Sequence, residues 1–359
     1  MSAPGSGIDV ELGDRCSATA YRWAQRTFAQ RAGGAGEISD FAAPFSVGMR
    51  FGNQRLAMTS DGIGTKIEVA ERLGTYETLG HDLVAMVVDD LICNGVEPSC
   101  LANILDVDHL DESTVDALMR GLHDAATLAK VAVAGGELAE LGDRIGGYGS
   151  GMHFNWCATA VGLLPEGRDA IDGRRITAGD SVVALECLGF RSNGFSLARR
   201  VLTAVFGERW HEAAFDDGTP VGPALLRPSR IFCRAIHAAL TAGLSLHGVA
   251  HITGGGIPSK LRRVLRPTGL GASLDSLFDP PPAMRFVQSL GSVSARVAYG
   301  TWNMGNGMLV VLPESEVEPL VRIAGEFGFP ARAAGRIHES PMLVIEARGA
   351  ELGQVAFGP

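Results

Sequence analysis

Strand-like and helix-like patterns alternate along the whole chain, and this alternation is the strongest constraint on its fold. Apolar residues recur at helical spacing over 79–94 and 111–128, while short apolar runs at 101–107, 131–134 and 308–312 predict strands. The same alternation occurs in both halves, without a sequence repeat of fixed period. It predicts a mixed α+β fold.

A chain of 359 residues is long enough for two domains, each with its own core. The stretch 165–180 is polar and rich in turn residues, so we place the boundary there and expect domains at 1–168 and 169–359. The hydrophobic fraction of 46% and the charged fraction of 20% are typical of globular domains rather than disordered segments.

The charge and cysteine patterns exclude several classes of protein. A formal net charge of -9 with no basic run argues against nucleic-acid binding. The longest apolar runs are strand-length, so we expect no membrane span, and the N-terminal segment has no signal-peptide pattern. The six cysteines lack zinc-ligand spacing and are interpreted as reduced thiols, which predicts a cytoplasmic protein.

The first loop with chemical potential is 61–66, with the sequence Asp-Gly-Ile-Gly-Thr-Lys. Its two glycines let the backbone turn tightly and point several amides in one direction. Asp61 has a side chain suited to a divalent cation, Thr65 to a phosphate or the cation, and Lys66 adds positive charge where a helix begins. An ordinary Asp-Gly turn before a helix explains the same six residues, and the loop is not a Walker motif.

Three aspartates lie within the predicted helix at 79–94. Asp82 and Asp89 are two helical turns apart and share a face, and Asp90 follows directly. Like charges on one helix face repel each other by a few tenths of a kcal/mol per exposed pair. Both a solvated face and a magnesium site account for this pattern.

Three further loops end in glycine or carry polar residues beside it. Gly135-Gly136-Glu137 follows a predicted strand, and Arg191–Gly194 precedes a predicted helix. In the segment 251–256, three glycines follow His251, Ile252 and Thr253, which favours an anion cradle built from backbone amides. Each loop alone also reads as a turn.

These four loops and the predicted helix at 79–94, in their order along the chain, resemble the signature segments of the aminoimidazole ribonucleotide synthetase family, as do 226–231 and 303–305. The resemblance covers roughly residues 45 to 345. It implies an N-terminal half-barrel sheet domain that dimerises, a C-terminal α/β sandwich-like domain, and a homodimer. It also implies an ATP- and Mg²⁺-dependent cyclo-ligase that phosphorylates an amide oxygen of a small phosphorylated substrate, formylglycinamidine ribonucleotide, and closes an imidazole ring in purine biosynthesis.

The resemblance also implies roles for individual residues, and it requires no covalent nucleophile. The magnesium and phosphate ligands would be Asp61, Asp82, Asp90 and Glu137. The catalytic residues would be Asp61, Lys66, Arg191 and His251. The residues contacting the nucleotide or substrate would be Gly62, Gly64, Thr65, Ser192, Asn193, Gly194, Thr253, Gly254, Gly255 and Gly256.

The chain departs from the family pattern at several of these positions. Arg191 stands where the family usually has His, Leu138 where it has Thr, Asp89 where it has Asn, and Gly300 where it has Arg. The segment 33–45 replaces a Gly-rich N-terminal loop. An Arg in place of His removes any acid–base role at that position.

Three hypotheses therefore stay open: a divergent purine enzyme, a paralogue that carries out a related ATP-dependent condensation, cyclisation or phosphorylation on another substrate, and a non-catalytic nucleotide binder. ATP hydrolysis that depends on formylglycinamidine ribonucleotide distinguishes the first from the other two. The intact carboxylates at 61, 82, 90 and 137 argue against the third.

Overall fold

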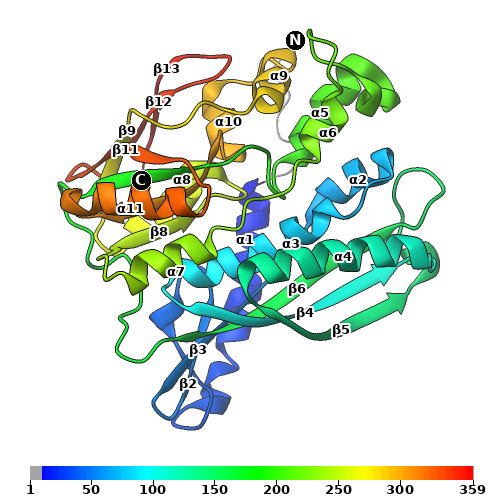
Figure 1. Cartoon of the computed structure of the whole chain (residues 1–359). Helices are drawn as coiled ribbons and strands as arrows, with labels where there is room; N and C mark the ends of the chain where they lie inside the picture. Colours follow the sequence, from blue (N-terminus) through cyan, green and yellow to red (C-terminus); the bar gives the residue numbers. More distant parts are fainter. Residues whose placement is uncertain (1–9, 359) are drawn as a thin grey trace.

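The computed structural model describes residues 10–358, which form two mixed sheets (Figure 1). The first sheet has six strands in the order β1-β2-β3-β6-β4-β5, and the second has seven in the order β13-β12-β9-β11-β7-β10-β8. The predicted mixed α+β fold with two domains is confirmed. The connection between the sheets runs from the end of β6 to the start of β7 and contains the boundary expected at residues 168 and 169.

The first sheet and its helices come from the N-terminal half of the chain. Their bounds are α1 Val10–Gln25, η1 Phe28–Arg31, β1 Glu37–Ser39, η2 Asp40–Ala42, β2 Val47–Phe51, β3 Gln54–Gly62, η3 Gly64–Lys66, α2 Ile67–Leu73, α3 Thr78–Cys93, β4 Glu97–Val107, α4 Glu112–Ala129, β5 Ala132–Glu140, η4 Gly142–Arg144 and β6 Phe154–Leu164.

The second sheet and its helices follow in the C-terminal half. Their bounds are β7 Ser181–Glu186, α5 Phe195–Phe206, η5 Gly207–Glu212, α6 Val221–Leu225, α7 Cys233–Thr241, β8 Gly248–His251, α8 Gly256–Leu265, β9 Gly271–Leu274, α9 Pro282–Leu290, α10 Ala295–Thr301, β10 Asn306–Leu312, η6 Glu314–Glu316, α11 Val317–Glu326, β11 Ala331–His338, β12 Leu343–Ala347 and β13 Gly353–Phe357.

Local sequence signals explain where several of these elements begin and end. Helix α4 begins after Asp111, whose side chain accepts a hydrogen bond from the Thr114 amide, an N-cap that satisfies a free donor. Strand β5 continues to Glu140, beyond the predicted 131–134, because its parallel pairing with β4 extends that far. Helix α1 ends at Gln25, and a 3₁₀ turn at Phe28–Arg31 follows.

Helices α3 and α4 lie against one face of the first sheet, and two glycines let them pack closely (Figure 1). A Cβ added at Gly121 would lie 1.8 Å from the Glu77 carbonyl oxygen, and one added at Gly80 would lie 2.1 Å from the Gly121 carbonyl carbon. The opposite face of the sheet exposes apolar side chains, among them Met58, Ile104 and Leu163. One face of this sheet therefore belongs to the core, and the other is an uncovered apolar surface.

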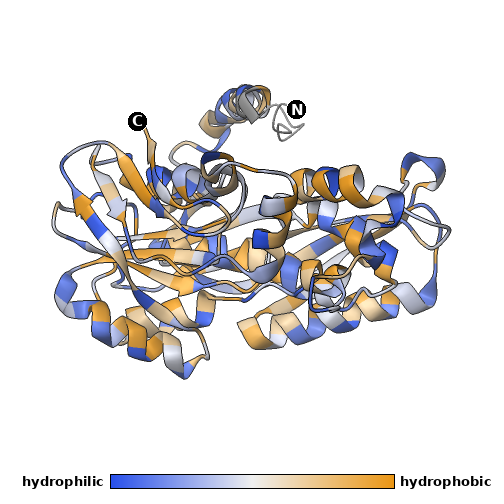
Figure 2. Ribbon diagram, turned by 90° about the horizontal axis from the view of Figure 1, so that it is seen from above, coloured by the Kyte–Doolittle hydropathy of each residue, from blue (hydrophilic) through white to orange (hydrophobic). Residues whose placement is uncertain are grey.

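The second sheet has its most buried strand, β10, between β7 and β8. Helix α11 packs on β7 and β11, while α8 packs on β8 and on α10. Hydrophobic and hydrophilic residues alternate along the helices of the ribbon, as expected of helices that have one apolar and one polar face (Figure 2). No helix within residues 10–358 is long and apolar enough to cross a membrane.

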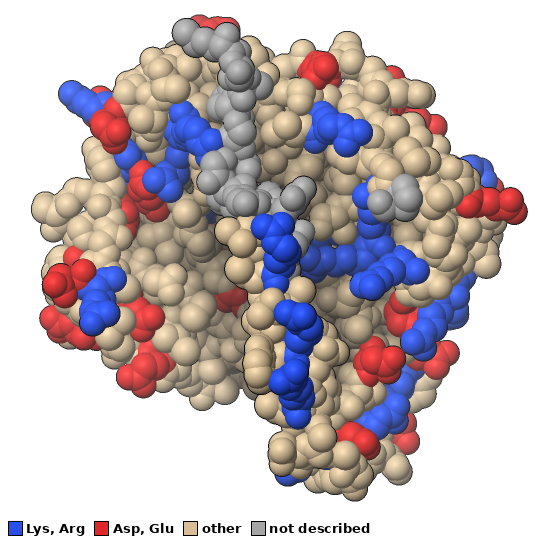
Figure 3. Space-filling view, turned by 180° about the vertical axis from the view of Figure 1, so that it is seen from behind, with Lys and Arg blue, Asp and Glu red and all other residues tan. Residues whose placement is uncertain are grey.

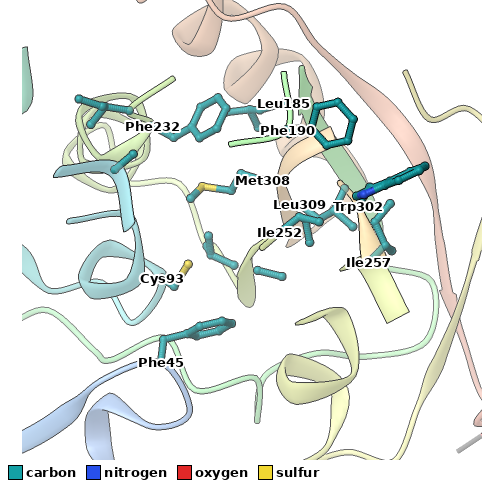
Figure 4. Packing of buried hydrophobic residues seen from close by; sticks show 14 of the residues in the cluster. Phe45, Cys93, Leu185, Phe190, Phe232, Ile252, Ile257, Trp302, Met308 and Leu309 are labelled. Atoms are coloured by element: carbon teal, nitrogen blue, oxygen red, sulfur yellow. The ribbon is translucent and has the colours of Figure 1, made fainter. Parts of the chain in front are cut away.

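The cores of the two domains are continuous. Helix α3 contacts both α7 and β8 of the second domain. Side chains from both sides, including Phe45 and Cys93 of the first domain and Phe232, Ile252 and Met308 of the second, belong to one buried apolar cluster (Figure 4). The two domains therefore meet through a packed interface, and α3 is its central element.

The close contact between α3 and α4 gives a stability prediction. Gly121→Ala should lower the free energy of unfolding by about 1–3 kcal/mol, because the added methyl group overlaps backbone atoms that cannot move independently. Urea denaturation measures the change.

The matched control is Gly325→Ala, on α11, where an added Cβ meets nothing within 4 Å. This change should be neutral or stabilise the protein by up to about 1 kcal/mol, since Ala favours helix over Gly. Equal effects of the two substitutions would contradict the packing explanation.

Candidate functional site

Three of the predicted loops, distant in sequence, meet at the domain interface. A Cβ added at Gly64 would have the Ser192 carbonyl oxygen as its nearest neighbour, at 3.9 Å. One added at Gly254 would lie 3.4 Å from the amide nitrogen of the Asn193 side chain. The loops 61–66, 192–194 and 251–256 therefore lie side by side, and the place where they meet is called the junction below.

Close backbone approaches hold two of these loops in place. Gly194 has φ 80° and leaves no room for a side chain, because an added Cβ would lie 2.3 Å from the Trp302 ring. The Trp302 indole N–H donates to the Gly194 carbonyl at 3.1 Å. Gly256 has φ 60°, and its added Cβ would lie 1.9 Å from the Tyr299 carbonyl oxygen. Only glycine fits these two positions, so the loops are rigid scaffolds.

Two polar side-chain atoms of the loop 192–194 are buried without a hydrogen-bond partner in the described part of the chain. Among the described residues, the Ser192 hydroxyl and the Asn193 side-chain carbonyl are buried and have no hydrogen-bond partner. Thr253 is also buried, and helix α8 begins directly after the glycine loop. Buried polar groups are nearly always satisfied, by protein, water or ligand. This junction is therefore suited to a polar or anionic ligand at the N-terminus of α8.

Two carboxylates lie next to this junction, Asp61 at the end of β3 and Asp90 on α3. Burial raises the pKa of Asp61 to about 6, opposed by a hydrogen bond from the Gly62 amide. Burial raises the pKa of Asp90 to about 7, opposed by the charges of Lys260 and Arg263. Each of the two carboxylates is therefore costly to ionise in the free protein, and a bound cation would favour the ionised form.

Lys260 is a candidate site residue that the sequence reasoning missed. It lies on α8, and its positive charge acts on both Asp61 and Asp90. Burial and the neighbouring Arg263 lower the pKa of Lys260. The sequence feature that could have identified Lys260 is its position, four residues after the helix α8 begins at Gly256. Lys and Arg side chains also gather near the middle of the rear face of the molecule (Figure 3).

The structure places Lys66 and Asp82, two of the predicted site residues, in a buried ion pair. Both side chains are fully buried and form an ion pair at 2.6 Å. The Lys66 ammonium also donates to the Arg227 carbonyl at 2.7 Å, and Asp82 accepts from the Ser229 hydroxyl and amide. The contacts to Arg227 and Ser229 join the two domains, so Lys66 and Asp82 are engaged within the domain interface, while the catalytic and metal-binding roles stay predictions.

Arg191, predicted to be catalytic, is also fully buried and paired. Its guanidinium donates to Asp89 at 2.9 Å and to the Arg230 carbonyl at 2.9 Å. Asp89 in turn accepts from the Phe232 and Cys233 amides, at the N-terminus of α7. Two positions that depart from the family pattern, 89 and 191, are therefore a single buried ion pair, and Arg191 is not free to grip a ligand.

The four predicted metal ligands do not form one site. Within residues 10–358, no group of three or more His, Cys, Asp or Glu side chains is arranged to hold a metal ion. Strand register explains why Glu137 is separate from Asp61. Paired residues on neighbouring strands point to the same face of the sheet, and the pairings Glu137–Ile104, Ile104–Cys157 and Cys157–Gly62 therefore place Glu137 on the same face as Gly62. Asp61 precedes Gly62 in the strand, so it points to the opposite face. Glu137 is exposed there, and Asp82 is bound to Lys66.

The remaining departures lie outside the junction. Leu138 is an exposed residue on β5, and Gly300 lies on α10 with nothing within 4 Å of an added Cβ. The segment 33–45 contributes β1 to the edge of the first sheet and buries Phe41 and Phe45. None of these three features touches the loops that meet at the interface.

The chain is similar to known proteins over most of its length. Residues 40–164 match the model of the AIR synthase related protein N-terminal domain, and residues 177–348 match the corresponding C-terminal domain. A phosphoribosylformylglycinamidine cyclo-ligase from Thermococcus kodakarensis is 34% identical over 350 residues, covering 97% of this chain and 98% of that protein. Another from Sorangium cellulosum is 35% identical over 334 residues, covering 92% and 94%.

Solved structures share the fold at low sequence identity. A HypE–HypF complex contains a chain with TM-score 0.63 and 16% identity, covering 93% of this chain and 98% of that one. Thiamine-monophosphate kinase from Stenotrophomonas maltophilia K279a has TM-score 0.60 and 18% identity, with coverage of 90% and 95%. These structures share the fold of this chain, a two-domain protein with one mixed sheet in each domain. The chain belongs to the AIR synthase related family.

The raised pKa values at the site give a pH-dependent stability. Because the folded pKa values of Asp61 and Asp90 lie above the usual 3.8, the folded state holds more protons than the unfolded state between about pH 4 and pH 7. The contribution of these groups to stability is therefore fully present below pH 4 and is lost as the pH rises through 6 to 7.

Urea unfolding of the unmodified protein and of the Asp90→Asn variant, each at pH 5 and pH 8, measures this effect. The side-chain carbonyl of the variant can still accept a hydrogen bond from His251. The stability of the unmodified protein relative to the variant should be higher at pH 5 than at pH 8. A difference that is constant or larger at pH 8 would contradict the assignment.

Proposed function

We propose that this protein is an ATP-dependent cyclo-ligase that converts formylglycinamidine ribonucleotide to aminoimidazole ribonucleotide in purine biosynthesis, in the cytoplasm. The observation that carries the proposal is the junction of loops 61–66, 192–194 and 251–256, with Asp61, Asp90 and Lys260 beside it. Relatives with that activity in their names are 34% and 35% identical over nearly the whole chain.

The reaction needs positioning and charge neutralisation more than covalent chemistry. The amide oxygen of the substrate attacks the γ-phosphorus of ATP, ADP leaves, and the resulting iminophosphate loses phosphate when the amidine nitrogen attacks its carbon. The backbone amides of the glycine loop and the unpartnered Ser192 hydroxyl suit the phosphate oxygens. The Lys260 ammonium supplies positive charge for the transferred phosphoryl group.

Asp61 and Asp90 are the residues that fit a magnesium ion. Two carboxylates from the protein match the usual magnesium donor set, in which phosphate oxygens and water complete the coordination. Their raised pKa values show that each carries an uncompensated burial cost, which a cation relieves. When bound, the ion neutralises phosphate charge. A solved structure of the same fold, AaThiL, with TM-score 0.57 and 16% identity, is a complex with the ATP analogue AMPPCP and TMP. That complex supports nucleotide binding by this fold.

ADP release tests the proposal. The purified protein with MgATP should release ADP much faster when formylglycinamidine ribonucleotide is present than when it is absent. Lys260→Met should lower the substrate-dependent rate by about 10²-fold or more, by analogy with other groups that stabilise transition-state charge. A coupled assay of ADP formation measures both effects.

The chain has three lysines, and Lys130→Met is the matched control, because Lys130 is an exposed residue at the end of α4. This variant should retain the full rate. No stimulation by the substrate would contradict the purine reaction, and equal rates in the Lys130 and Lys260 variants would remove Lys260 from the mechanism.

One observation favours a second candidate, a paralogue that acts on another amide, amidine or phosphate acceptor. The buried Asp89–Arg191 pair sits one residue from Asp90 and directly against His251, where the family pattern has different residues. MgATP binding without stimulation by formylglycinamidine ribonucleotide would support this candidate.

We also propose that the protein is a homodimer joined through the uncovered face of the first sheet. Ile104 is 47% exposed on β4 and Leu163 is 41% exposed on β6, and both lie on the face opposite α3 and α4. Exposed apolar patches on a sheet of this kind are typical of protein interfaces. A second copy would cover this face and pack against the same surface in the first.

Ile104→Lys should convert the dimer to a monomer, because a charged side chain cannot be buried unpaired at the centre of an apolar interface. Sedimentation velocity measures the mass. Leu352→Lys is the control, since Leu352 is 78% exposed in the second domain and lies away from this sheet. A monomeric unmodified protein, or an Ile104 variant that remains dimeric, would contradict the proposed interface.

A further inference from the structure

We propose that Asp89, Arg191 and His251 form a buried relay that positions the Asp90 carboxylate across the domain interface. This inference deepens the proposed function, since Asp90 is one of the two carboxylates assigned to magnesium and phosphate. Asp89 on α3 binds amides at the start of α7 and pairs with Arg191, which follows β7. Arg191 also contacts His251 at the end of β8, and His251 contacts Asp90 on α3. Arg191 is a positioning residue in this scheme.

The direction of each hydrogen bond follows from the chemistry of arginine. The Arg191 guanidinium has only donors, so its 2.7 Å contact with His251 requires an unprotonated Nε2 on the imidazole. The remaining nitrogen, Nδ1, therefore carries the proton and donates to Asp90 Oδ1 at 2.8 Å. The pair fixes a single neutral tautomer of His251 and points its N–H at Asp90.

Asp89 is anchored independently of this arrangement. One of its oxygens accepts from the Phe232 and Cys233 amides at 2.8 and 2.9 Å, and the other accepts from Arg191. The Arg191 backbone has φ 59°, a left-handed conformation that is uncommon for residues other than glycine. The guanidinium contacts Asp89, His251 and the Arg230 carbonyl. These three contacts hold the side chain in place on this backbone.

The consequence is a link between domain contact and the geometry of the site. Asp89 and Asp90 belong to the first domain, whereas Arg191 and His251 belong to the second. If the guanidinium is removed, His251 loses the donor that selects its tautomer, and Asp90 loses a fixed hydrogen-bond donor. Loss of such supporting groups lowers metal affinity by about 10- to 100-fold in other sites.

Histidine nitrogen NMR on the ligand-free protein tests the relay directly. In the unmodified chain, His251 should give the pattern of one neutral tautomer protonated at Nδ1, assigned by its absence in His251→Gln. Arg191→Met should abolish that pattern and raise the dissociation constant for AMPPCP with Mg²⁺ by about tenfold or more. Asp89→Asn keeps an acceptor for the two backbone amides, so it provides a second variant if the first does not fold.

The control is Lys66→Met, which breaks the other buried ion pair at the domain interface, a pair whose two side chains both belong to the first domain. Both lysine and arginine variants should lower the urea midpoint, but only the arginine variant should alter the His251 signal. An unchanged His251 tautomer in Arg191→Met, or the same change in Lys66→Met, would overturn the relay. The signal is read without substrate, so failure of the cyclo-ligase reaction would leave this result intact.

Discussion

The burial of two carboxylates of α3 against the second domain is the constraint on which the rest of the structure depends. Asp82 and Asp89 accept hydrogen bonds from the segment 229–233 and pair with Lys66 and Arg191. A buried charge without a partner costs several kcal/mol, so these contacts permit only one arrangement of the domains. That arrangement brings the glycine loops together and places Asp90 beside them.

Sequence patterns singled out three loops that the structure brings together, but they did not reveal the partners of the side chains in those loops. Helical spacing placed Asp82 and Asp89 on one face, and the structure confirms it, yet the spacing could not reveal that this face meets backbone amides of another domain. Lys66 and Lys260 each lie at the start of a helix after a glycine loop. Only tertiary packing distinguishes them, because Lys66 is paired with Asp82 inside the interface whereas Lys260 lies among the charges of Arg263, Asp90 and Asp61.

The departures from the family pattern have a physical explanation in part. Asp89 and Arg191 differ together because each neutralises the other in a place that water does not reach. Glu137 was grouped with the metal ligands because the pattern carries no information on which sheet face a strand residue occupies. Pairing register supplies that information and assigns Glu137 to the face proposed for the dimer.

A crystal structure of the protein with a non-hydrolysable ATP analogue and magnesium tests the central claim most directly. The account predicts that the phosphates contact the loops 192–194 and 251–256 and the Lys260 ammonium, with the ion at Asp61 and Asp90 and the Lys66–Asp82 pair unchanged. Phosphates bound to Lys66, with the ion held by Asp82 or Glu137 of the same chain, would contradict it.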